Sequence, residues 1–481
     1  MSTYVSRFYQ VQKPSQFDYS TVEKKYFQVA PQSGNTQGNL NAGTPITFAY
    51  DGEKKMFRLA DPESGFFLKI AYRTKLGAAR AATAPLTLAN GWFGHLFSTA
   101  RFRLGSQDLE TISELGPVME VMQHLRGDQF RRLTGEDMTF IPDTGSGLAN
   151  TSLVSNAEVT RTADQITART TVPANVSSNN EDYNSGFRRR MNKYNYPLTG
   201  ATPNDGFRFV TAFIPLTAIF GCCEEDKLLK TIGFEINLTR KPTSEFHEVF
   251  FGAANTGVEF GDPGTTGVMS MTLQLVEYIP NPSLGPEVLK GLEKPFTWSF
   301  MQRNCISRTS NDTSSNFSQT YPGVPRFVFV VAKSMDADTL QHGAVTRNYS
   351  LNRHCNMNSI QVDVDGVKYP SDPQNGNFLE NNYSAFYQQF RTACKELEGY
   401  YTECSISPTE YKNLYTIFAV DCSNKPVKTK GSSSALTYNL TRNPLADDDV
   451  NAINPRSVKY FIISLIEKEY IIDCSQKSVR S

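Results

Sequence analysis

Few side chains in this sequence have the types and spacing that catalysis or metal binding requires. It contains five histidines, and no two of them stand at the spacing of a metal-ligand pair. It has no G-x-x-x-x-G-K-S/T phosphate-binding loop, no G-x-S-x-G nucleophile elbow and no H-E-x-x-H zinc motif. We therefore predict that the protein is not an enzyme and has neither a metal centre nor a cofactor.

Two sets of residues imitate ligand sites but have simpler interpretations. His95 and His354 each precede a strand that ends in a glycine turn, and we interpret both as structural histidines. Gln361, Asp363 and Asp365 imitate the first ligands of a calcium loop, although the first ligand should be Asp and the twelfth position should be Glu. The order strand, Asp-Gly, strand is typical of a hairpin turn, which we favour here.

The eight cysteines are too sparse for a disulfide scaffold, and no C-x-x-C pair occurs. We expect reduced and mostly buried thiols. Cys222 and Cys223 are adjacent, and on a strand their side chains would point to opposite faces, one buried and one exposed. Cys394 and Cys404 bracket the end of a predicted helix. A disulfide between them is one interpretation, and two buried free thiols are the interpretation that we prefer.

The densest basic cluster comprises Arg188, Arg189, Arg190 and Lys193, with aromatic residues around it. Basic and aromatic side chains together can bind nucleic acid. However, the cluster lies in a long polar segment of a chain whose 48 basic and 48 acidic residues cancel. We therefore predict that these four residues form a surface or inter-subunit contact, and that the protein does not recognise nucleic acid by sequence.

Composition bounds the class of protein. The chain has 481 residues, of which 39% are hydrophobic and 12% aromatic, so it can build large cores and is not globally disordered. Residues 1–25 lack the apolar core of a signal peptide. The longest uncharged apolar stretch, 209–223, is interrupted by Pro215 and is shorter than the roughly 20 residues that span a bilayer. We expect a soluble protein of two domains.

Alternating apolar and polar residues predict a mainly β chain. The clearest alternating segments are 68–73, 101–104, 232–239, 269–275, 360–365 and 436–441. Two runs, 327–332 and 460–466, are apolar throughout, which predicts strands covered on both faces. Only two segments have helical periodicity, from Pro117 to Gly127 and from about Tyr383 to Leu397, so we expect about one helix in each half of the chain.

The two halves share an order of motifs that indicates an internal repeat. In the first half an Ile-Phe pair at 219–220 precedes the tetrapeptide Asn-Leu-Thr-Arg at 237–240. In the second half an Ile-Phe pair at 417–418 precedes the same tetrapeptide at 439–442. In both halves the helix comes before these motifs and a further strand follows them. We infer two copies of one β-domain.

We predict a first domain at 46–282, a second at 283–481 and an arm at 1–45, with the Pro-rich segment 279–286 as the joint. A β-domain of about 200 residues with long connections indicates an eight-stranded sandwich of the jelly-roll type. The first domain also contains a polar insertion at 143–205, and a connection of this length is usually functional or flexible. A small hairpin near 157–172 is compatible with its sequence.

Three segments together carry a resemblance to a known family. They are 90–112 (NGWFGHLFSTARFRLGSQDLETI), 209–240 and 325–370, the last of which contains PRFVFVVAKS and RHCNMNSIQVDVDGVKYP. Their order resembles that of the double jelly-roll major capsid proteins of Polinton/Maverick or adintovirus-type eukaryotic double-stranded DNA viruses, which are distantly similar to adenovirus hexon. The sequence departs from the family at Arg353, where relatives carry an acidic residue, and at the insertion 143–205.

This resemblance implies that three chains associate into a pseudo-hexameric capsomer and that capsomers tile an icosahedral shell. It also implies neighbouring capsomers, a penton protein and minor or cement capsid proteins as partners. The expected location is the virion capsid, after synthesis in the host cytoplasm. An alternative function is a tandem jelly-roll protein that binds a carbohydrate or a receptor. We expect the insertion 143–205 to form an outer tower.

The predicted arm would contact a neighbouring chain or an inner layer of the particle. Its aromatic and basic residues are the candidates for this contact, namely Tyr4, Phe8, Tyr9, Lys24 and Lys25. Whether the inner face meets a membrane is left open by the sequence.

Overall fold

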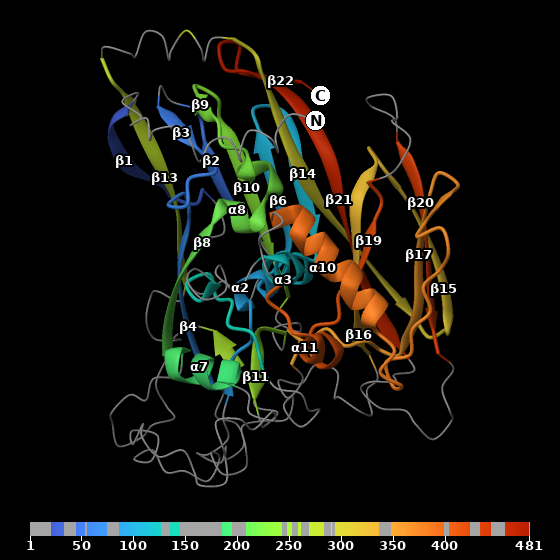
Figure 1. The fold of residues 1–481 in the computed structure, drawn as a ribbon. Helices are drawn as coiled ribbons and strands as arrows, with labels where there is room; N and C mark the ends of the chain where they lie inside the picture. Colours follow the sequence, from blue (N-terminus) through green and yellow to red (C-terminus); the bar gives the residue numbers. More distant parts are fainter. Residues whose placement is uncertain are drawn as a thin grey trace, which may run out of the picture.

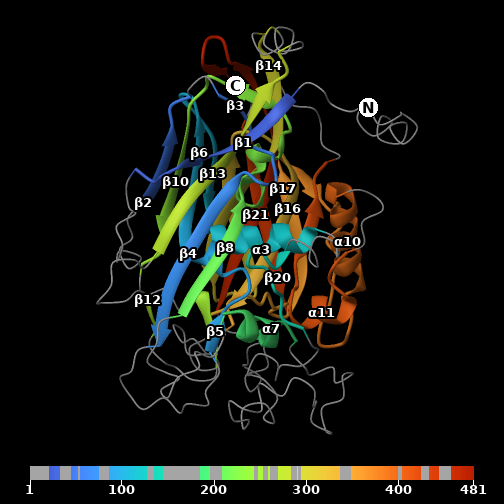
Figure 2. The same cartoon turned by 90° about the vertical axis from the view of Figure 1, so that its left-hand side faces the viewer.

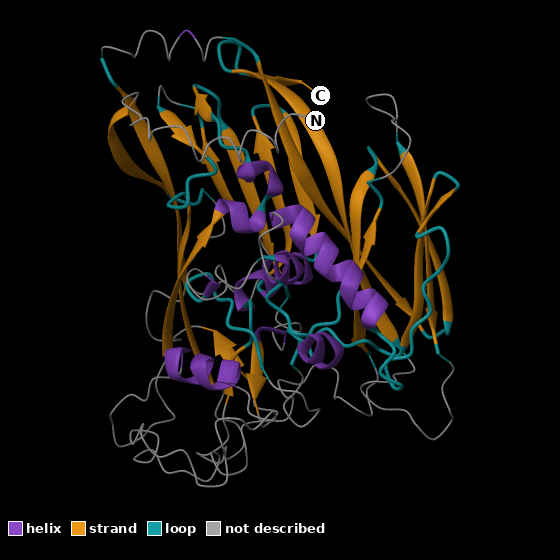
Figure 3. Ribbon diagram, viewed as in Figure 1, coloured by secondary structure: helices purple, strands orange, loops and turns teal. Residues whose placement is uncertain are grey.

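The computed structural model describes residues 21–32, 45–52, 55–74, 86–126, 135–144, 185–194, 208–242, 248–252, 258–260, 269–282, 290, 294–335, 348–398, 404–423, 433–443 and 457–480. Strands dominate these residues, and short helices lie between and beside the sheets (Figure 3). Every strand pair in this part of the chain joins two strands before residue 283 or two strands after residue 293. We call these two groups the first half and the second half.

The first half contains two facing sheets, with the strand orders β1-β13-β4-β8 and β2-β10-β6-β7. In the first sheet these strands are β1 (Thr21–Val29), β13 (Met269–Pro280), β4 (Gly65–Thr74) and β8 (Arg208–Pro215). In the second they are β2 (Pro45–Tyr50), β10 (Phe234–Arg240), β6 (Phe97–Leu104) and β7 (Gln107–Ser113). The rings of Phe48 in β2 and Phe66 in β4 meet across the core, with centroids 5.1 Å apart. Figure 2 shows β1, β13, β4 and β8 side by side.

Five shorter strands complete the first half. Three of them, β3 (Met56–Arg58), β9 (Leu228–Lys230) and β12 (Val258–Phe260), extend the first sheet. The other two, β5 (Leu86–Leu88) and β11 (Phe250–Gly252), pair with each other.

The second half repeats the two-sheet arrangement, with the strand orders β14-β21-β16-β19 and β15-β20-β17-β18. The first sheet is built from β14 (Phe296–Ser310), β21 (Val458–Asp473), β16 (Pro325–Ser334) and β19 (Phe418–Asp421), with β22 (Ser478–Arg480) added to β21. The second is built from β15 (Ser314–Tyr321), β20 (Ser434–Arg442), β17 (Met357–Val364) and β18 (Val367–Tyr369). The runs 327–332 and 460–466, predicted to be strands covered on both faces, lie in β16 and β21, and every residue of the two runs is buried.

The two halves have the same topology. When the eight principal strands of each half are numbered along the chain, one sheet has the order 1-8-3-6 and the other has the order 2-7-4-5. The tetrapeptides at 237–240 and 439–442 both lie in the seventh strand. In each half the ladder from this strand to the fourth strand skips one residue beside the arginine, Ser98 near Arg240 and Asn358 near Arg442. The predicted repeat is therefore confirmed down to a shared β-bulge.

Both predicted helices are present, and each connects the fifth strand of its half to the sixth. They are α3 (Leu115–Leu125) and α10 (Ser384–Glu398). The remaining described helices are α2 (Trp92–His95), α7 (Ser185–Tyr194), α8 (Leu216–Ile219), η4 (Gly221–Glu224) and α11 (Pro408–Asn413). None of these five was anticipated, and α7 lies inside the insertion predicted at 143–205. The hairpin suggested near 157–172 lies outside the described residues.

The predicted arm at 1–45 is wrong for Thr21–Val29. These residues form β1, which pairs antiparallel with β13 from Thr21 to Val29. The segment TVEKKYFQV lacks regular alternation because Lys24 and Lys25 are adjacent, and this irregularity concealed the strand. Residues 1–20 lie outside the described part of the chain.

The core is continuous across the two halves, and one cluster of buried apolar side chains includes residues from both. The long axis of the molecule has two different ends (Figure 1). β9 and β22 lie at one end, whereas α7, β5 and β11 lie at the other (Figures 1 and 2).

Candidate functional site

The two halves meet through an interface that is unusually rich in buried charge. β14 of the second half packs against β7 and η4 of the first, and α10 packs against α3. We call this contact the inter-sandwich interface. It is defined by four acidic residues of the first half and by the second-half residues that bind them. The acidic residues are Glu110, Glu114, Glu120 and Asp143.

Glu110 of β7 joins the backbones of both halves. Its carboxylate accepts the N–H of Arg303 in β14 at 2.7 Å and the N–H of Cys222 in η4 at 3.0 Å. The Arg303 guanidinium donates to three carbonyls of α8 at 3.1, 3.0 and 2.8 Å and to the carboxylate of Glu224 at 2.5 Å. Glu110 and Arg303 are both buried, but the guanidinium has its ion-pair partner in Glu224, so removing the Glu224 carboxylate would leave the buried Arg303 charge without that partner.

Glu120 of α3 lies opposite Lys333 of β16, with 3.6 Å between the carboxylate oxygen and the ammonium nitrogen. The side-chain amide of Asn352 donates to the other carboxylate oxygen at 3.1 Å. Lys333 also donates to the carbonyl of Tyr349. The side chains of Glu120 and Lys333 are 1% and 3% exposed, so water does not screen this ion pair.

Glu114 adjoins the start of α3, where its backbone has a left-handed φ of 52°. Its carboxylate accepts from Lys459 of β21 at 3.1 Å and from the Ser307 hydroxyl of β14 at 3.2 Å. Lys241 of the first half lies 3.8 Å from the same carboxylate and also binds Glu248. Glu114 therefore connects one cation from each half.

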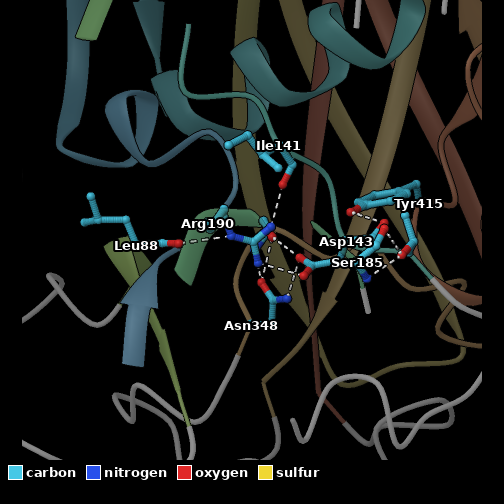
Figure 4. A network of polar contacts seen from close by, with 9 residues as sticks. Leu88, Ile141, Asp143, Ser185, Arg190, Asn348 and Tyr415 are labelled. Carbon is cyan, nitrogen blue, oxygen red and sulfur yellow. Dashed lines mark hydrogen bonds and ion pairs between the residues drawn. The ribbon is translucent and has the colours of Figure 1, made fainter. Parts of the chain in front are cut away.

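Asp143 is the centre of the network drawn in Figure 4. Its carboxylate accepts from the second-half side chains of Asn348 at 2.8 Å and Ser350 at 3.3 Å. The hydroxyl of Tyr415, also from the second half, donates to its backbone carbonyl at 3.1 Å. The other carboxylate oxygen binds the guanidinium of Arg190 at 2.7 Å. The loop that carries Asp143 is thus bonded to the second half on one side and to α7 on the other.

Arg190 attaches α7 to the rest of the first half. Besides its ion pair with Asp143, it donates to the carbonyls of Leu88 at 3.1 Å and Ile141 at 2.5 Å (Figure 4). Its side chain is 0% exposed. These three charge-assisted bonds use all three guanidinium nitrogens, Nε, Nη1 and Nη2, and fix the position of α7 against β5.

The insertion leaves and re-enters the fold at one point. The hydroxyls of Thr144 and Ser185 are 2.9 Å apart, and the N–H of Ser185 donates to the Thr144 hydroxyl at 2.9 Å. Segment 145–184 therefore begins and ends at a hydrogen-bonded pair of residues. We call this pair the Thr144–Ser185 closure.

Burial changes the protonation of two carboxyl groups in the interface. Desolvation raises the pKa of Glu110 from its ordinary value of 4.5 to about 7, against the attraction of Arg303. Desolvation likewise raises the pKa of Glu120 to about 7, against the attraction of Lys333. The inter-sandwich interface is consequently sensitive to pH near neutrality.

The predicted basic cluster separates into unlike environments. The prediction of a surface contact is wrong for Arg190, because the buried carboxylate of Asp143 and two carbonyls bind its guanidinium. Arg189 is exposed and binds Glu136 at 2.6 Å, and Lys193 donates to the Glu136 carbonyl at 2.7 Å. For these two residues the surface contact stays a prediction. The side chain of Arg188 lies outside the described residues.

The candidate arm residues are divided in the same way. Lys24 and Lys25 lie in β1, where Lys24 approaches Asp61 at 3.4 Å and Lys25 approaches Glu23 at 3.4 Å. Tyr4, Phe8 and Tyr9 lie outside the described residues. A contact between Lys24 or Lys25 and a neighbouring chain remains a prediction, although both residues lie in strand β1 and not in an arm.

The two predicted structural histidines are buried. Burial lowers the pKa of His95, which lies 3.9 Å from the Glu248 carboxylate. Burial also lowers the pKa of His354 to about 3, and its ring stacks on Phe378 with 4.6 Å between centroids. Both therefore serve packing, as predicted. The hairpin predicted at Asp365-Gly366 is confirmed, since it joins β17 to β18.

The prediction for the adjacent cysteines is wrong. Cys222 and Cys223 lie in the 3-10 helix η4, and both are buried. A helical turn does not place consecutive side chains on opposite faces as a strand does. Cys394 is buried whereas Cys404 is partly exposed, with 3.8 Å between their Sγ atoms, so the expected burial holds for Cys394 alone.

Neither a metal cluster nor a membrane-spanning helix occurs in the part of the chain that the structure describes. No group of three or more His, Cys, Asp or Glu side chains there is arranged to hold a metal ion. Likewise, none of the helices described is long and apolar enough to cross a membrane.

Similarity to known proteins is evident in structure but not in sequence. No protein-family model and no curated protein matches the sequence. A chain in the cryo-EM structure of the Sputnik virophage has a TM-score of 0.57 at 9% identity, with 97% of this chain and 90% of that chain covered. The mavirus major capsid protein has a TM-score of 0.52 at 11% identity, with coverages of 100% and 94%.

A third structure agrees with these two. The Faustovirus major capsid protein has a TM-score of 0.51 at 9% identity, with 98% of this chain and 94% of that chain covered. The match includes both halves, each with the strand orders described above. The fold is a double jelly roll. The predicted fold class is thereby confirmed, and the double jelly roll spans nearly the whole chain.

The sequence did not identify the residues of the inter-sandwich interface, because each acts through a distant partner. Glu110 and Arg303, for example, are 193 positions apart. The sequence of α3 gave no signal for the burial of Glu120. Glu120, Gln123 and His124 stand at i, i+3 and i+4 and share one face of the helix, a pattern typical of a face turned to solvent, whereas the structure buries all three. A buried carboxylate requires a partner, and the sequence does not say which one.

Proposed function

We propose that this double jelly-roll protein is a viral major capsid protein. In this proposal, three chains associate into a pseudo-hexameric capsomer, and the capsomers tile an icosahedral shell. The observation that carries the proposal is the inter-sandwich interface. It holds two sandwiches of equal topology side by side around a shared core, which is the arrangement that a pseudo-sixfold building unit requires. The mavirus and Faustovirus relatives, which are major capsid proteins by name, support the same function.

The oligomeric state tests this proposal. Analytical ultracentrifugation of the purified chain should give a particle of about 160 kDa, three times the chain mass of 53.7 kDa, or larger shells. Negative-stain images should show particles with a hexagonal outline. A protein that remains monomeric at micromolar concentration and is folded by circular dichroism would contradict the proposal.

We further propose that residues 1–20 contact a neighbouring chain or an inner layer, through Tyr4, Phe8 and Tyr9. Deletion of residues 1–20 retains β1 and should preserve the capsomer but abolish shell formation. Deletion of residues 1–29 also removes β1, which pairs with β13 along its length, and should prevent folding of the first half. Shells formed normally after the shorter deletion would refute a role for these residues.

The insertion is proposed to form the outer tower of the particle. In support, α7 lies at the end of the molecule opposite β22 (Figure 1). An epitope tag inserted between residues 144 and 185 should bind its antibody on intact particles, whereas a tag after residue 481 should bind only after disruption. If instead the tag after residue 481 binds on intact particles and the tag in the insertion binds only after disruption, the insertion faces the inside of the particle and the proposed orientation is wrong.

The remaining partners belong to the same proposal. They are neighbouring capsomers, a penton protein and minor or cement proteins, in a virion assembled after synthesis in the host cytoplasm. The proposed domains are 46–282 and 283–481, with β1 now added to the first. Membership of the Polinton/Maverick or adintovirus type is proposed from the segments 90–112, 209–240 and 325–370. Mass spectrometry of purified particles would test the partners.

A further inference from the structure

One pair of thiols differs from the other cysteines of the chain. The Sγ atoms of Cys394 and Cys404 are 3.8 Å apart. None of the eight cysteines is in a disulfide in the structure, and seven of them are buried, whereas Cys404 is partly exposed. A small oxidant therefore has access to one member of a pair whose sulfur atoms are already in contact.

Neighbouring contacts hold this pair in position. Cys394 lies on the buried face of α10, and the hydroxyl of Tyr387 on the same helix donates to the carbonyl of Ile406 at 2.8 Å. Ser405, next to Cys404, donates to the carbonyl of His124 in α3 at 3.2 Å. The segment that carries Cys404 is thus attached to α10 and, across the inter-sandwich interface, to the first half.

The environment also favours attack by Cys404. The hydrogen bond from the Cys394 thiol lowers the pKa of Cys404, and the N–H of Ile406 and the charge of Arg391 act in the same direction. Burial instead raises the pKa of Cys305 and Cys474, which makes those thiols poor nucleophiles. A thiolate that is accessible and lies beside a second thiol is the arrangement of redox-sensitive cysteine pairs.

We propose that Cys394 and Cys404 form an intrachain disulfide in the presence of a low-molecular-weight disulfide such as oxidised glutathione. The Cys404 thiolate attacks one sulfur of oxidised glutathione, which forms a mixed disulfide and releases one glutathione thiolate. That thiolate takes the proton of Cys394. The Cys394 thiolate then attacks the Sγ of Cys404 and releases the second glutathione. Two protein thiols are oxidised, and one glutathione disulfide is reduced to two thiols.

The disulfide would attach the C-terminal part of α10 covalently to the segment that contacts α3. Closing this short loop restricts the unfolded chain and stabilises the second half together with its contact to the first. This consequence rests on the proposed function: a capsomer made in a reducing cytosol would gain the cross-link after the particle reaches an oxidising environment.

The proposal is tested on the full-length chain incubated with an excess of either reduced or oxidised glutathione. Alkylation should count eight free thiols in the first case and six in the second, and peptide mass spectrometry should identify a Cys394–Cys404 link. The melting temperature of the oxidised protein should rise by about 5 °C. Cys394→Ser should accumulate the mixed disulfide of Cys404 with glutathione. Cys404→Ser should form neither this mixed disulfide nor the intrachain disulfide. Cys474→Ser is the matched control and should retain the link.

Eight free thiols after oxidation, or a link between other cysteines, would overturn the proposed site. A link that leaves the melting temperature unchanged would overturn its stabilising role. The outcome is independent of the oligomeric state. A monomeric protein that forms the link would refute the capsid function but support the disulfide. Trimers that do not form the link would support the capsid function but refute the disulfide.

Discussion

The helices α3 and α10 occupy the same place in the two sandwiches but have opposite surroundings. Each follows the fifth strand of its half and precedes the sixth. All side chains of α3 except that of Met122 are buried. α10 buries Phe386 and Phe390 against β19 but exposes Gln388 and Thr392. A repeated topology has therefore been adapted to two environments, one inside the molecule and one at its surface.

The difference follows from how the halves are placed. The second half covers α3 with β16, α10 and the residues around Asn352, so the polar groups of α3 must find buried partners. Nothing in the described part of the chain covers the outer face of α10 in the same way. The internal repeat therefore fixes the path of the backbone, whereas packing against the other half decides which side chains each helix contains.

Two glutamates give this comparison its sharpest test. Glu120 of α3 and Glu396 of α10 both pair with cations on β16, Lys333 at 3.6 Å and Arg326 at 3.9 Å. The Glu120–Lys333 pair is buried, whereas the side chains of Glu396 and Arg326 are 28% and 32% exposed. At pH 5, Glu120→Ala should lower the free energy of unfolding by about 2–3 kcal/mol, because it removes a hydrogen-bonded group from a buried site and leaves the Asn352 amide without its acceptor. Glu396→Ala should lower it by less than about 1 kcal/mol. Urea denaturation measures both.

Equal losses in the two variants would show that burial does not distinguish the two ion pairs. Removing the buried ammonium provides a control for Glu120→Ala. Adding Lys333→Met should recover part of the lost stability, since a buried charge is then removed.

The dependence of stability on pH is the next largest effect. The pKa of Glu120 is 4.5 unfolded and about 7 folded, so the folded chain binds this proton more tightly and acid favours folding. Its contribution is complete below pH 4.5 and is lost as the pH rises to 7, up to about 3 kcal/mol. Glu110 should act in the same direction. Glu120→Gln should flatten the profile of unfolding free energy against pH, and Glu110→Gln with Glu120→Gln should flatten it further. An unchanged profile in the double variant would contradict the assignment.

Gly116 of α3 and Ala385 of α10 both stand at the second position of their helix, and opposite substitutions at the two positions should both destabilise the protein. A Cβ on Gly116 of α3 would lie 2.4 Å from Nδ1 of His95, whose ring is itself buried. Gly116→Ala should therefore destabilise the protein by about 1–3 kcal/mol, although alanine is the better helix former. Ala385 of α10 is exposed, and replacing it with glycine should cost about 1 kcal/mol or less. Thermal denaturation would record both changes. A rise in melting temperature for Gly116→Ala would contradict the close packing of Gly116 against the His95 ring.

The smallest effect is expected on the outer face of α10. Thr392 is exposed, and its hydroxyl only donates to the carbonyl of Gln388 one turn earlier, at 3.0 Å. Thr392→Ala should raise stability by about 0.5 kcal/mol through helix propensity. Gln123→Ala in α3 removes a buried side chain and should instead destabilise. A loss of stability in both variants would mean that the outer face of α10 is covered in the protein as purified, for instance by a second chain.

The topology was largely predictable because it depends on local patterns. The alternation along 232–239 and 436–441 and the shared Asn-Leu-Thr-Arg tetrapeptide identified equivalent strands, which the structure confirms as β10 and β20. The two helices were predictable from their periodicity. β1 was missed because two adjacent lysines interrupt its alternation. The strand depends on its pairing with β13, about 250 positions away, rather than on its own pattern.

The inter-sandwich interface could not be predicted, because its chemistry arises only from burial. Arg190 illustrates the limit. In the sequence it stands between exposed basic neighbours, and only the position of Asp143 in space makes it an internal residue. Similarly, the pKa values of Glu110 and Glu120 reflect desolvation by the second half. Sequence patterns specify which backbone forms but not which charges it encloses.

The Thr144–Ser185 closure has a consequence for how such a protein can change over time. Since the chain between these two residues departs from and rejoins a single bonded point, its length and content can vary without moving a strand. Arg190 anchors the rejoining helix independently of what precedes it. Insertions or deletions between residues 144 and 185 should therefore leave the strand pairings of both sandwiches unchanged.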